Sequence, residues 1–264
     1  MFLRDRVAVI HGGGGAIGGA IARCFGREGA RVHLTGRTPA KLEAVAADVV
    51  AGGGQASWAQ LDLLDEARVQ AHAEELAARA GRIDVLVNAV GILHVQGTPF
   101  ADLSLADFMH PVEGYVRSHF IAAQAAARYM PRGGVMLSLS TPGARLAGSG
   151  FMGNAVASAA VEAISRVLAG ELGERGIRTV CLRPDAIPQA LEAGSHAREV
   201  FRKAAAAAGI SVEAMLDGRA ASAPLLRRLP TLDEVAEFAA FAASTRGGAM
   251  TGVIANLNCG SLVD

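Results

Sequence analysis

The stretch that decides the fold is glycine-rich and lies near the amino terminus: His11-Gly12-Gly13-Gly14-Gly15-Ala16-Ile17-Gly18-Gly19. A short run of β-favouring residues, Val7–Ile10, precedes it, and helical spacing follows over Ala16–Phe25. Glycines between a strand and a helix allow positive φ and a close approach of the backbone to a ligand. The first turn of the helix adds unpaired N–H groups and the positive end of the helix dipole. The stretch therefore predicts a turn that can hold a pyrophosphate, although an ordinary tight turn can also be glycine-rich.

Apolar runs alternate with helical patterns from one end of the chain to the other. Further strands are predicted at Arg31–Leu34, Ala56–Leu61, Val85–Val87, Val135–Leu139, Thr179–Leu182 and Val253–Leu257, and further helices at Pro39–Val50, Glu66–Ala80, Leu105–Met130, Met152–Leu172 and Asp233–Ala243. This alternation predicts an α/β fold, namely a doubly wound, Rossmann-type, mostly parallel seven-stranded sheet with helices on both faces. The 264 residues contain no repeat and no linker-like segment, so one domain is expected over residues 1–264.

One stretch interrupts the alternation. Pro188–Pro230 is long and helix-prone, and it precedes the last helix and strand. Insertions at the carboxyl ends of strands commonly form the walls of ligand sites in such folds. We therefore expect a substrate lid at about residues 188–230. Its apolar segments, Ala204–Ile210 and Leu225–Leu226, favour a partly apolar small-molecule substrate.

The composition excludes several classes of partner. Twenty-five basic and 25 acidic residues give a formal charge of zero, and no run of Lys or Arg occurs, so neither nucleic acid nor a membrane surface is an expected partner. Cys24, Cys181 and Cys259 lack metal-ligand spacing, so no metal is expected and the thiols are predicted to be reduced. The charged start is not a signal peptide, and no apolar stretch is long enough to span a bilayer. A cytoplasmic protein is expected.

Several motifs in order resemble those of the short-chain dehydrogenases/reductases, and the resemblance extends over essentially the whole chain. The Thr-Gly-x-x-x-Gly-x-Gly turn of that family corresponds to His11, Gly12, Ala16 and Gly18, so that histidine replaces the threonine and alanine the middle glycine. The remaining motifs match the family's Asn-Asn-Ala-Gly, Arg-Pro-Gly and carboxyl-terminal segments, and they are Asn88-Ala89-Val90-Gly91, Arg183-Pro184-Asp185-Ala186-Ile187, Pro230–Ala236, Thr251-Gly252 and Asn258-Cys259-Gly260.

The resemblance implies a nicotinamide cofactor. In this family an acidic residue at the end of the second strand selects NAD, whereas here Gly36 takes that place and Arg37 follows. A guanidinium can bind a 2′-phosphate with two hydrogen bonds, so NADP(H) is favoured over NAD(H), unless Arg37 is only a solvated loop charge. The residues implied in cofactor binding are Gly12, Gly14, Ile17, Gly18, Arg37, Asp62, Leu63, Asn88, Gly91, Pro184 and Ile187.

The catalytic motif of the family departs most from its usual form. That family uses a Tyr-x-x-x-Lys pair with a Ser and an Asn, because a nearby cation brings the phenol's pKa toward the working pH. The positions that correspond to Tyr, Lys, Ser and Asn are Asn154, Ser158, Thr141 and, approximately, Tyr115. The wider Tyr-x6-Lys spacing of the related enoyl-thioester reductases would place their tyrosine at Phe151, again without a hydroxyl. The chain's only other tyrosine is Tyr129 and its only lysines are Lys41 and Lys203, so no pair exists at either spacing.

Other residues offer partial substitutes. Asn154 does not titrate, but with Thr141 it can polarise a carbonyl, leaving the proton to water or another group. Tyr115 can offer a hydroxyl or merely fill space. His94 can act as an acid or base or be an exposed loop residue. Asp185 can accept a proton or, as the preferred interpretation, cap the segment that follows it.

Four more residues are expected to have no chemical role. Three of them share a predicted helix with Tyr115: His110, Glu113 and His119, which lies one turn beyond Tyr115. All three are interpreted as solvated or at a subunit contact. His11 is interpreted as replacing a structural hydrogen bond of the missing threonine.

These observations favour a divergent NADP(H)-dependent oxidoreductase that acts on a carbonyl or enone-like small molecule. Two other functions stay open: an inactive NADP(H)-binding sensor or partner subunit, and a non-redox isomerase or dehydratase. The resemblance also implies a homodimer or homotetramer, and the alanine-rich helix expected from Asn154 to Ala169 would suit close packing in such an assembly.

Overall fold

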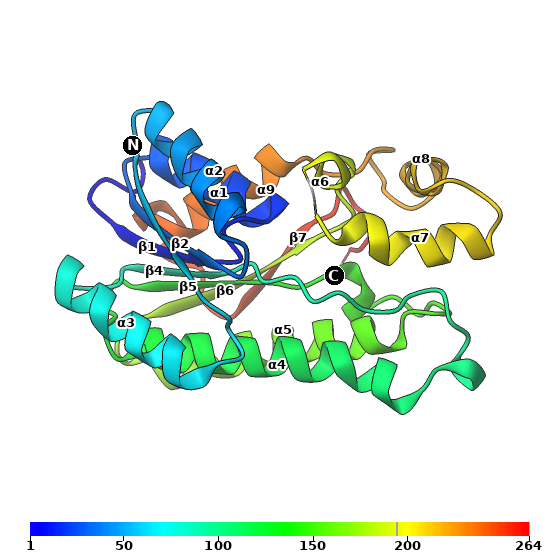
Figure 1. Ribbon diagram of the computed structural model, residues 1–264, viewed down its shortest axis with the longest axis horizontal. Helices are drawn as coiled ribbons and strands as arrows, with labels where there is room; N and C mark the ends of the chain where they lie inside the picture. Colours follow the sequence, from blue (N-terminus) through cyan, green and yellow to red (C-terminus); the bar gives the residue numbers. More distant parts are fainter. Residues whose placement is uncertain (194, 264) are drawn as a thin grey trace.

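The computed structural model describes residues 1–193 and 195–263. Its strands form one parallel sheet of seven in the order β3-β2-β1-β4-β5-β6-β7 (Figure 1). The strands are β1 (Val7–His11), β2 (Arg31–Gly36), β3 (Gln55–Gln60), β4 (Val85–Asn88), β5 (Val135–Leu139), β6 (Arg178–Pro184) and β7 (Val253–Leu257). The predicted α/β fold is confirmed, and all the strand pairs found among the described residues are parallel.

Helices connect the strands and lie on both faces of the sheet. They are α1 (Ala16–Arg27), α2 (Pro39–Ala51), α3 (Glu66–Ala80), α4 (Leu105–Ala127), α5 (Met152–Gly173), α6 (Pro188–Glu192), α7 (Ala197–Ala207), α8 (Val212–Ser222) and α9 (Leu232–Ala243), with short 3-10 turns at η1 (Phe100–Asp102), η2 (Pro142–Ala144) and η3 (Thr245–Gly247). The helix expected to reach Met130 ends at Ala127, because Pro131 disfavours a helical conformation in the residue before it.

Local side-chain chemistry explains where several helices begin. Ser104 and Asp65 accept hydrogen bonds from the third backbone N–H of α4 and α3, respectively. Thr231 and Glu234 form a complete capping box at the start of α9. These caps satisfy N–H groups that a helix cannot pair internally.

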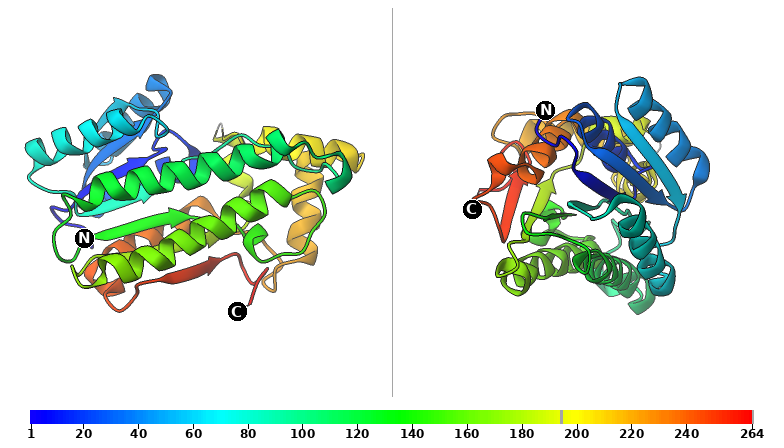
Figure 2. Two further views of the ribbon diagram at one scale, coloured as in Figure 1. Left: turned by 90° about the horizontal axis from the view of Figure 1, so that it is seen from below. Right: turned by 90° about the vertical axis from the view of Figure 1, so that its left-hand side faces the viewer.

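The sheet is covered by two layers of helices. Helices α1, α2 and α9 pack on one face, and α3, α4 and α5 on the other, with α4 and α5 side by side (Figures 1 and 2). Each face has its own apolar core, and every residue of the central strands β1 and β4 is buried. Burial on both faces explains why these strands are continuous apolar runs rather than alternating ones.

The strand order reverses beside β1, which lies between β2 and β4. A crevice forms outside the carboxyl ends of strands at such a switch point. Residues 188–230, which break the alternation in the sequence, contain α6, α7 and α8. These helices share a small apolar cluster of their own and lie beyond the carboxyl ends of the strands (Figure 1).

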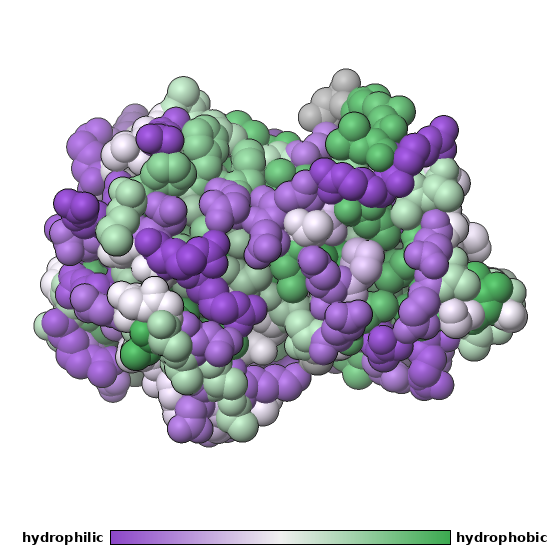
Figure 3. All heavy atoms as spheres, turned by 90° about the horizontal axis from the view of Figure 1, so that it is seen from above, coloured by the Kyte–Doolittle hydropathy of each residue, from purple (hydrophilic) through white to green (hydrophobic). Residues whose placement is uncertain are grey.

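The surface of residues 188–230 carries exposed hydrophobic side chains, including Ile210, Leu225 and Leu226. In Figure 3 hydrophobic atoms are prominent among hydrophilic ones at the end of the molecule that carries these helices. Among the described residues, no helix has the length and apolar character needed to cross a membrane, and no group of three or more potential ligands is placed to hold a metal ion.

Candidate functional site

A cavity of about 790 Å³ opens at the carboxyl ends of the central strands. Its walls include all four candidate catalytic residues, Tyr115, Thr141, Asn154 and Ser158. They also include nine of the eleven candidate cofactor residues, namely Gly12, Gly14, Ile17, Arg37, Asp62, Leu63, Gly91, Pro184 and Ile187. The remaining two, Gly18 and Asn88, do not line it. The fold thus gathers into one hollow most of the residues that the sequence singled out.

At two positions the backbone of the glycine-rich turn is packed too closely to leave room for a side chain. Gly12 has a φ of +75°, and a Cβ at that position would lie 2.4 Å from the backbone oxygen of Ala89. A Cβ at Gly18 would lie 2.3 Å from the oxygen of Gly12. Gly18 therefore lets α1 pack against the turn instead of contacting a ligand. No side chain caps α1 at Gly15, so the first N–H groups of this helix are available to an anion such as a pyrophosphate.

His11 is the last residue of β1 and lies directly before the glycine-rich turn. Its Nδ1 lies 2.6 Å from Thr35 Oγ1, which joins the ends of β1 and β2. The imidazole is buried, and burial lowers its pKa to about 3, so the ring is neutral. The expected structural hydrogen bond is present.

Charged residues stand at the end of the cavity next to β2. Arg37 directly follows β2, and Lys41 lies on α2, where its Cβ is 2.9 Å from the place that a Cβ on Gly14 would occupy. The carboxylate of Asp62 accepts the N–H of Leu64 at 3.0 Å and so shapes the loop that follows β3. Lys41 was not among the predicted cofactor residues, because its closeness to the turn depends on how α2 packs.

Asn88 shapes the loop beyond β4. Its Oδ1 accepts the N–H of Val90 at 3.2 Å, and its buried Nδ2 has no hydrogen-bond partner among the described residues. Gly91, further along this loop, lines the cavity.

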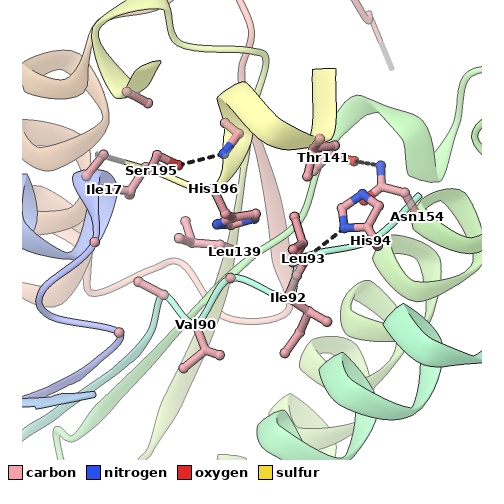
Figure 4. Close-up of a pocket in the computed structure, with 18 of the residues that line it drawn as sticks. Ile17, Val90, Ile92, Leu93, His94, Leu139, Thr141, Asn154, Ser195 and His196 are labelled. Atoms are coloured by element: carbon pink, nitrogen blue, oxygen red, sulfur yellow. Dashed lines mark hydrogen bonds between the residues drawn. The ribbon is translucent and has the colours of Figure 1, made fainter. Parts of the chain in front are cut away.

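The candidate catalytic side chains meet where β5 ends and α5 begins. The amide nitrogen of Asn154 donates to Thr141 Oγ1 at 3.2 Å (Figure 4). The same oxygen lies 2.9 Å from Ser158 Oγ. Asn154 and Ser158 are one turn apart on α5 and both are buried. This cluster offers hydroxyl and amide donors at the wall of the cavity, which suits stabilisation of a developing oxyanion.

A buried ion pair, Glu162 with Arg183, is linked to this cluster through Ser140, the residue before Thr141. Both oxygens of Glu162 accept hydrogen bonds from Arg183, at 2.7 and 2.8 Å, and Ser140 donates to the same carboxylate at 2.6 Å. The guanidinium also donates to Asn256 at 2.8 Å, so α5, β5, β6 and β7 are joined. The sequence analysis missed this pair, although Glu162 lies two turns beyond Asn154 on one helix face, which was the available signal.

Two candidate residues, Tyr115 and His94, form hydrogen bonds with atoms of the loop after β4. The hydroxyl of Tyr115 accepts the N–H of Ile92 at 3.2 Å, and burial raises its pKa. His94 Nδ1 lies 2.7 Å from the oxygen of Ile92, and its Nε2 lies 2.9 Å from the amide nitrogen of Gln96. These partners require His94 to donate at Nδ1 and accept at Nε2. Burial lowers its pKa, in keeping with a neutral ring.

The neighbouring helix residues differ in their surroundings. His110 and Glu113 are exposed, as expected. His119 is buried instead of solvated, and its Nδ1 lies 2.8 Å from the backbone oxygen of Tyr115. Burial lowers its pKa to about 4. The expectation for His119 was therefore wrong, because the close packing of α4 against the sheet covers this face.

Asp185 is fully engaged in hydrogen bonds. Arg219 Nε and Nη2 donate to its two oxygens at 2.7 and 2.9 Å, and the Ser261 hydroxyl and the Ala186 N–H complete the set. The preferred interpretation, that Asp185 caps the following segment, fits this arrangement. No oxygen is left over to accept a proton from a substrate. Arg219 belongs to α8, so the pair also fastens residues 188–230 to the end of β6.

His196 is a cavity residue that the sequence analysis did not identify. It precedes α7, and its ring packs so closely on Gly91 that a Cβ there would lie 2.0 Å from Cε1 of the imidazole. Only the packing of the 188–230 segment brings this residue to the loop after β4, about a hundred residues earlier in the chain. No local pattern could have indicated the contact.

The fold and the cavity together indicate the class of protein to which this chain belongs. A doubly wound parallel sheet, with a glycine turn and an open helix start at its switch point, is a dinucleotide-binding domain. The model of a family described as enoyl-(acyl carrier protein) reductase matches residues 14–261, and the chain belongs to the short-chain dehydrogenase/reductase family. Members of this family are oxidoreductases that use a nicotinamide cofactor and act on small molecules.

Individual relatives agree with this assignment. D-threitol dehydrogenase of Mycolicibacterium smegmatis is 31% identical over 187 residues, which are 70% of this chain and 71% of that protein. A short-chain dehydrogenase from Burkholderia cenocepacia J2315, solved in complex with NADP, is 26% identical with a TM-score of 0.83 and 99% of each chain covered. An NAD+-bound xylitol dehydrogenase, 22% identical with a TM-score of 0.89 over 98% of this chain and all of that one, shares the fold.

Proposed function

We propose that the protein is a divergent NADP(H)-dependent oxidoreductase that acts on a carbonyl or enone-like small molecule. The observation that carries the proposal is the continuity of one cavity, which joins the glycine turn at Gly12 to the hydrogen-bonded cluster of Thr141, Asn154 and Ser158. A ligand that spans this cavity presents one end to an anion-binding turn and the other to oxyanion-stabilising donors.

The turn fits a dinucleotide. At Gly12 any Cβ would collide with the backbone of Ala89, so glycine is needed for the turn to pack there, and the open start of α1 suits a pyrophosphate. Arg37 and Lys41 add positive charge where an acidic residue would favour NAD, so we assign the 2′-phosphate of NADP(H) to them. The relative solved with NADP supports this preference.

Replacing Arg37 by alanine tests the cofactor preference. We expect the wild-type protein to bind NADPH more tightly than NADH. The variant should lose roughly ten- to hundredfold in NADPH affinity, because a charge-assisted pair is lost, and little in NADH affinity. Titration of both cofactors by fluorescence measures this, with the exposed Arg117→Ala as the control. Equal affinities for the two cofactors, or an unchanged NADPH affinity in the Arg37 variant, would contradict the assignment.

The chain's own groups suggest how a reaction would proceed. A bound nicotinamide cofactor supplies or accepts a hydride. Asn154 and Thr141 would hold and polarise the substrate oxygen through N–H and O–H donors, and Ser158 would position Thr141. The chain has no Tyr and Lys at the spacing of the family's proton-transfer pair. An amide does not titrate near neutral pH, so the proton would come from water within the cavity.

The walls of the outer cavity indicate the substrate class. They are mainly apolar, with side chains from the loop before α5 and from α7 and α8, including Leu146, Phe151, Phe201, Met215 and Leu216. Among the described residues that line this outer part of the cavity, Arg219 is the one cation. Asp185 balances its charge. We therefore propose an uncharged, partly apolar substrate, covered by residues 188–230 acting as a lid.

A panel of aldehydes, ketones and enones, followed by NADPH absorbance, tests turnover. We expect consumption with an apolar member of the panel, and a kcat reduced about a hundredfold or more in Asn154→Ala and Thr141→Val, since each removes an oxyanion donor. The NADPH affinity of both variants should match the wild type. Robust NADP-dependent oxidation of simple secondary alcohols would contradict the site. Binding without turnover would indicate a sensor or partner subunit, and product formation without net NADPH consumption would indicate isomerisation.

We further propose a homodimer or homotetramer in the cytoplasm. The side-by-side helices α4 and α5 expose Phe120 and Val167 on their outer surfaces, which suits a contact between copies. The free cysteines Cys24, Cys181 and Cys259 suit a reducing compartment.

A further inference from the structure

His196 lies in the middle of the cavity. In Figure 4 it stands between Ile17, on the side of the glycine turn, and the pair of Thr141 and Asn154. Its ring rests on the backbone of Gly91 and lines the same cavity as these residues. A dinucleotide laid from Arg37 to Asn154 must therefore pass this imidazole.

The ring of His196 has free hydrogen-bonding capacity. It makes no hydrogen bond to any residue in the part of the chain that the structure describes, although the neighbouring Ser195 Oγ accepts the N–H of Ala197 at 3.1 Å and fixes the backbone there. By contrast, both ring nitrogens of His94 have partners. His196 is thus the cavity histidine that can offer an N–H to a ligand.

Positive groups surround His196. Burial lowers its pKa, and so do the charges of Arg37 after β2 and Lys41 on α2. The start of α7, with the positive end of its dipole, lies beside the ring and also lines the cavity. Three contributions of one sign at the centre of a groove favour a ligand of opposite charge, and a dinucleotide phosphate is one.

We propose that His196 is a cofactor-binding residue, delivered by residues 188–230 to the centre of the groove, which binds the anionic dinucleotide in its protonated form and makes cofactor binding proton-linked. This rests on the proposed function.

The sign of the pH dependence follows from linkage. In the free protein the lowered pKa keeps His196 neutral near pH 7.5. The negative cofactor raises that pKa, so binding takes up a proton and the affinity for NADPH increases as the pH falls. The useful window lies between about pH 7 and 8.5, above the range near 6 in which a phosphate monoester itself titrates.

Calorimetric titration of NADPH at pH 7.5 in buffers of different ionisation enthalpy counts the protons taken up. We expect a substantial fraction of one proton for the wild type and none for His196→Gln, whose dissociation constant at pH 7 should rise about tenfold, as for the loss of a charged hydrogen bond. The NMR signal of the His196 ring should titrate at higher pH with NADPH than without it. His110→Gln, at an exposed histidine outside the cavity, should match the wild type.

Four outcomes would overturn the proposal. If His196→Ala tightens NADPH binding, the imidazole is an obstacle and not a ligand. If the wild type binds NADPH without proton uptake, or if His196→Gln keeps the full uptake, the proposed function stands and the role of His196 falls. If the wild type does not bind NADPH at any pH in the window, both fall.

Discussion

Gly12→Ala is expected to abolish high-affinity NADPH binding. The alanine Cβ would lie 2.4 Å from the oxygen of Ala89, and the φ of +75° is strained for any residue with a Cβ. Left-handed strain costs about 1–2 kcal/mol, and overpacking against rigid backbone costs about 1–3 kcal/mol more. Relief requires β1 and β4 to separate at the floor of the cavity, so we expect at least a roughly hundredfold loss of affinity, measured by fluorescence titration.

Two further glycine variants separate the two causes of the expected loss of affinity, which are backbone strain and steric clash. Gly81→Ala has a comparable φ of +86° but meets nothing within 4 Å, so it carries the backbone strain without the clash and should bind NADPH normally. Gly18→Ala places a Cβ 2.3 Å from Gly12 without left-handed strain and should lose affinity. Circular dichroism checks that each variant is folded. A Gly12→Ala protein that is folded and keeps its NADPH affinity within twofold would rule out the glycine turn as the cofactor site.

Glu162→Gln is expected to destabilise the fold more than any other single substitution considered. It removes the negative charge that accepts two hydrogen bonds from the Arg183 guanidinium, which is only 2% exposed, and it disturbs the Ser140 hydrogen bond. Breaking one partner of a buried ion pair costs roughly 3–5 kcal/mol, which corresponds to about 10 °C in the unfolding midpoint of a domain of this size. Thermal and denaturant unfolding measure the loss.

A surface pair provides the control for this prediction. Glu199 and Arg202 form a fully exposed pair three residues apart on α7. Glu199→Gln should leave the unfolding midpoint unchanged, because solvent screens such pairs. An equal effect of the two substitutions would show that the Glu162–Arg183 pair contributes no more than a surface contact.

Much of the fold could be predicted because its signals are local. The alternation of apolar runs and helical spacing placed each strand, and each helix outside residues 188–230, with ends within three residues, since burial on both faces makes the central strands continuous apolar runs. Helix ends were less accurate where a boundary depends on tertiary contacts. Arg175, for example, donates to the backbone oxygen of Ala127, the last residue of α4, and to that of Met130 beyond it.

The candidate site was predictable to the extent that its residues follow strands. Parallel strands end at one edge, so residues at or after the carboxyl ends of β1, β2, β4, β5 and β6 necessarily converge there. This is why Gly12, Arg37, Gly91, Thr141 and Pro184 line one cavity.

The sequence by itself determined the sheet, its order of elements, the glycine turn and the absence of a Tyr–Lys pair at the family's spacing. Only the tertiary structure decided the partners of side chains from distant segments: Asp185 with Arg219, Glu162 with Arg183, and His196 against Gly91. The physical reason is that periodicity reports which face of an element is buried. The path of an insertion, and so the side chains that it brings to the cavity, follows from packing between elements far apart in the chain.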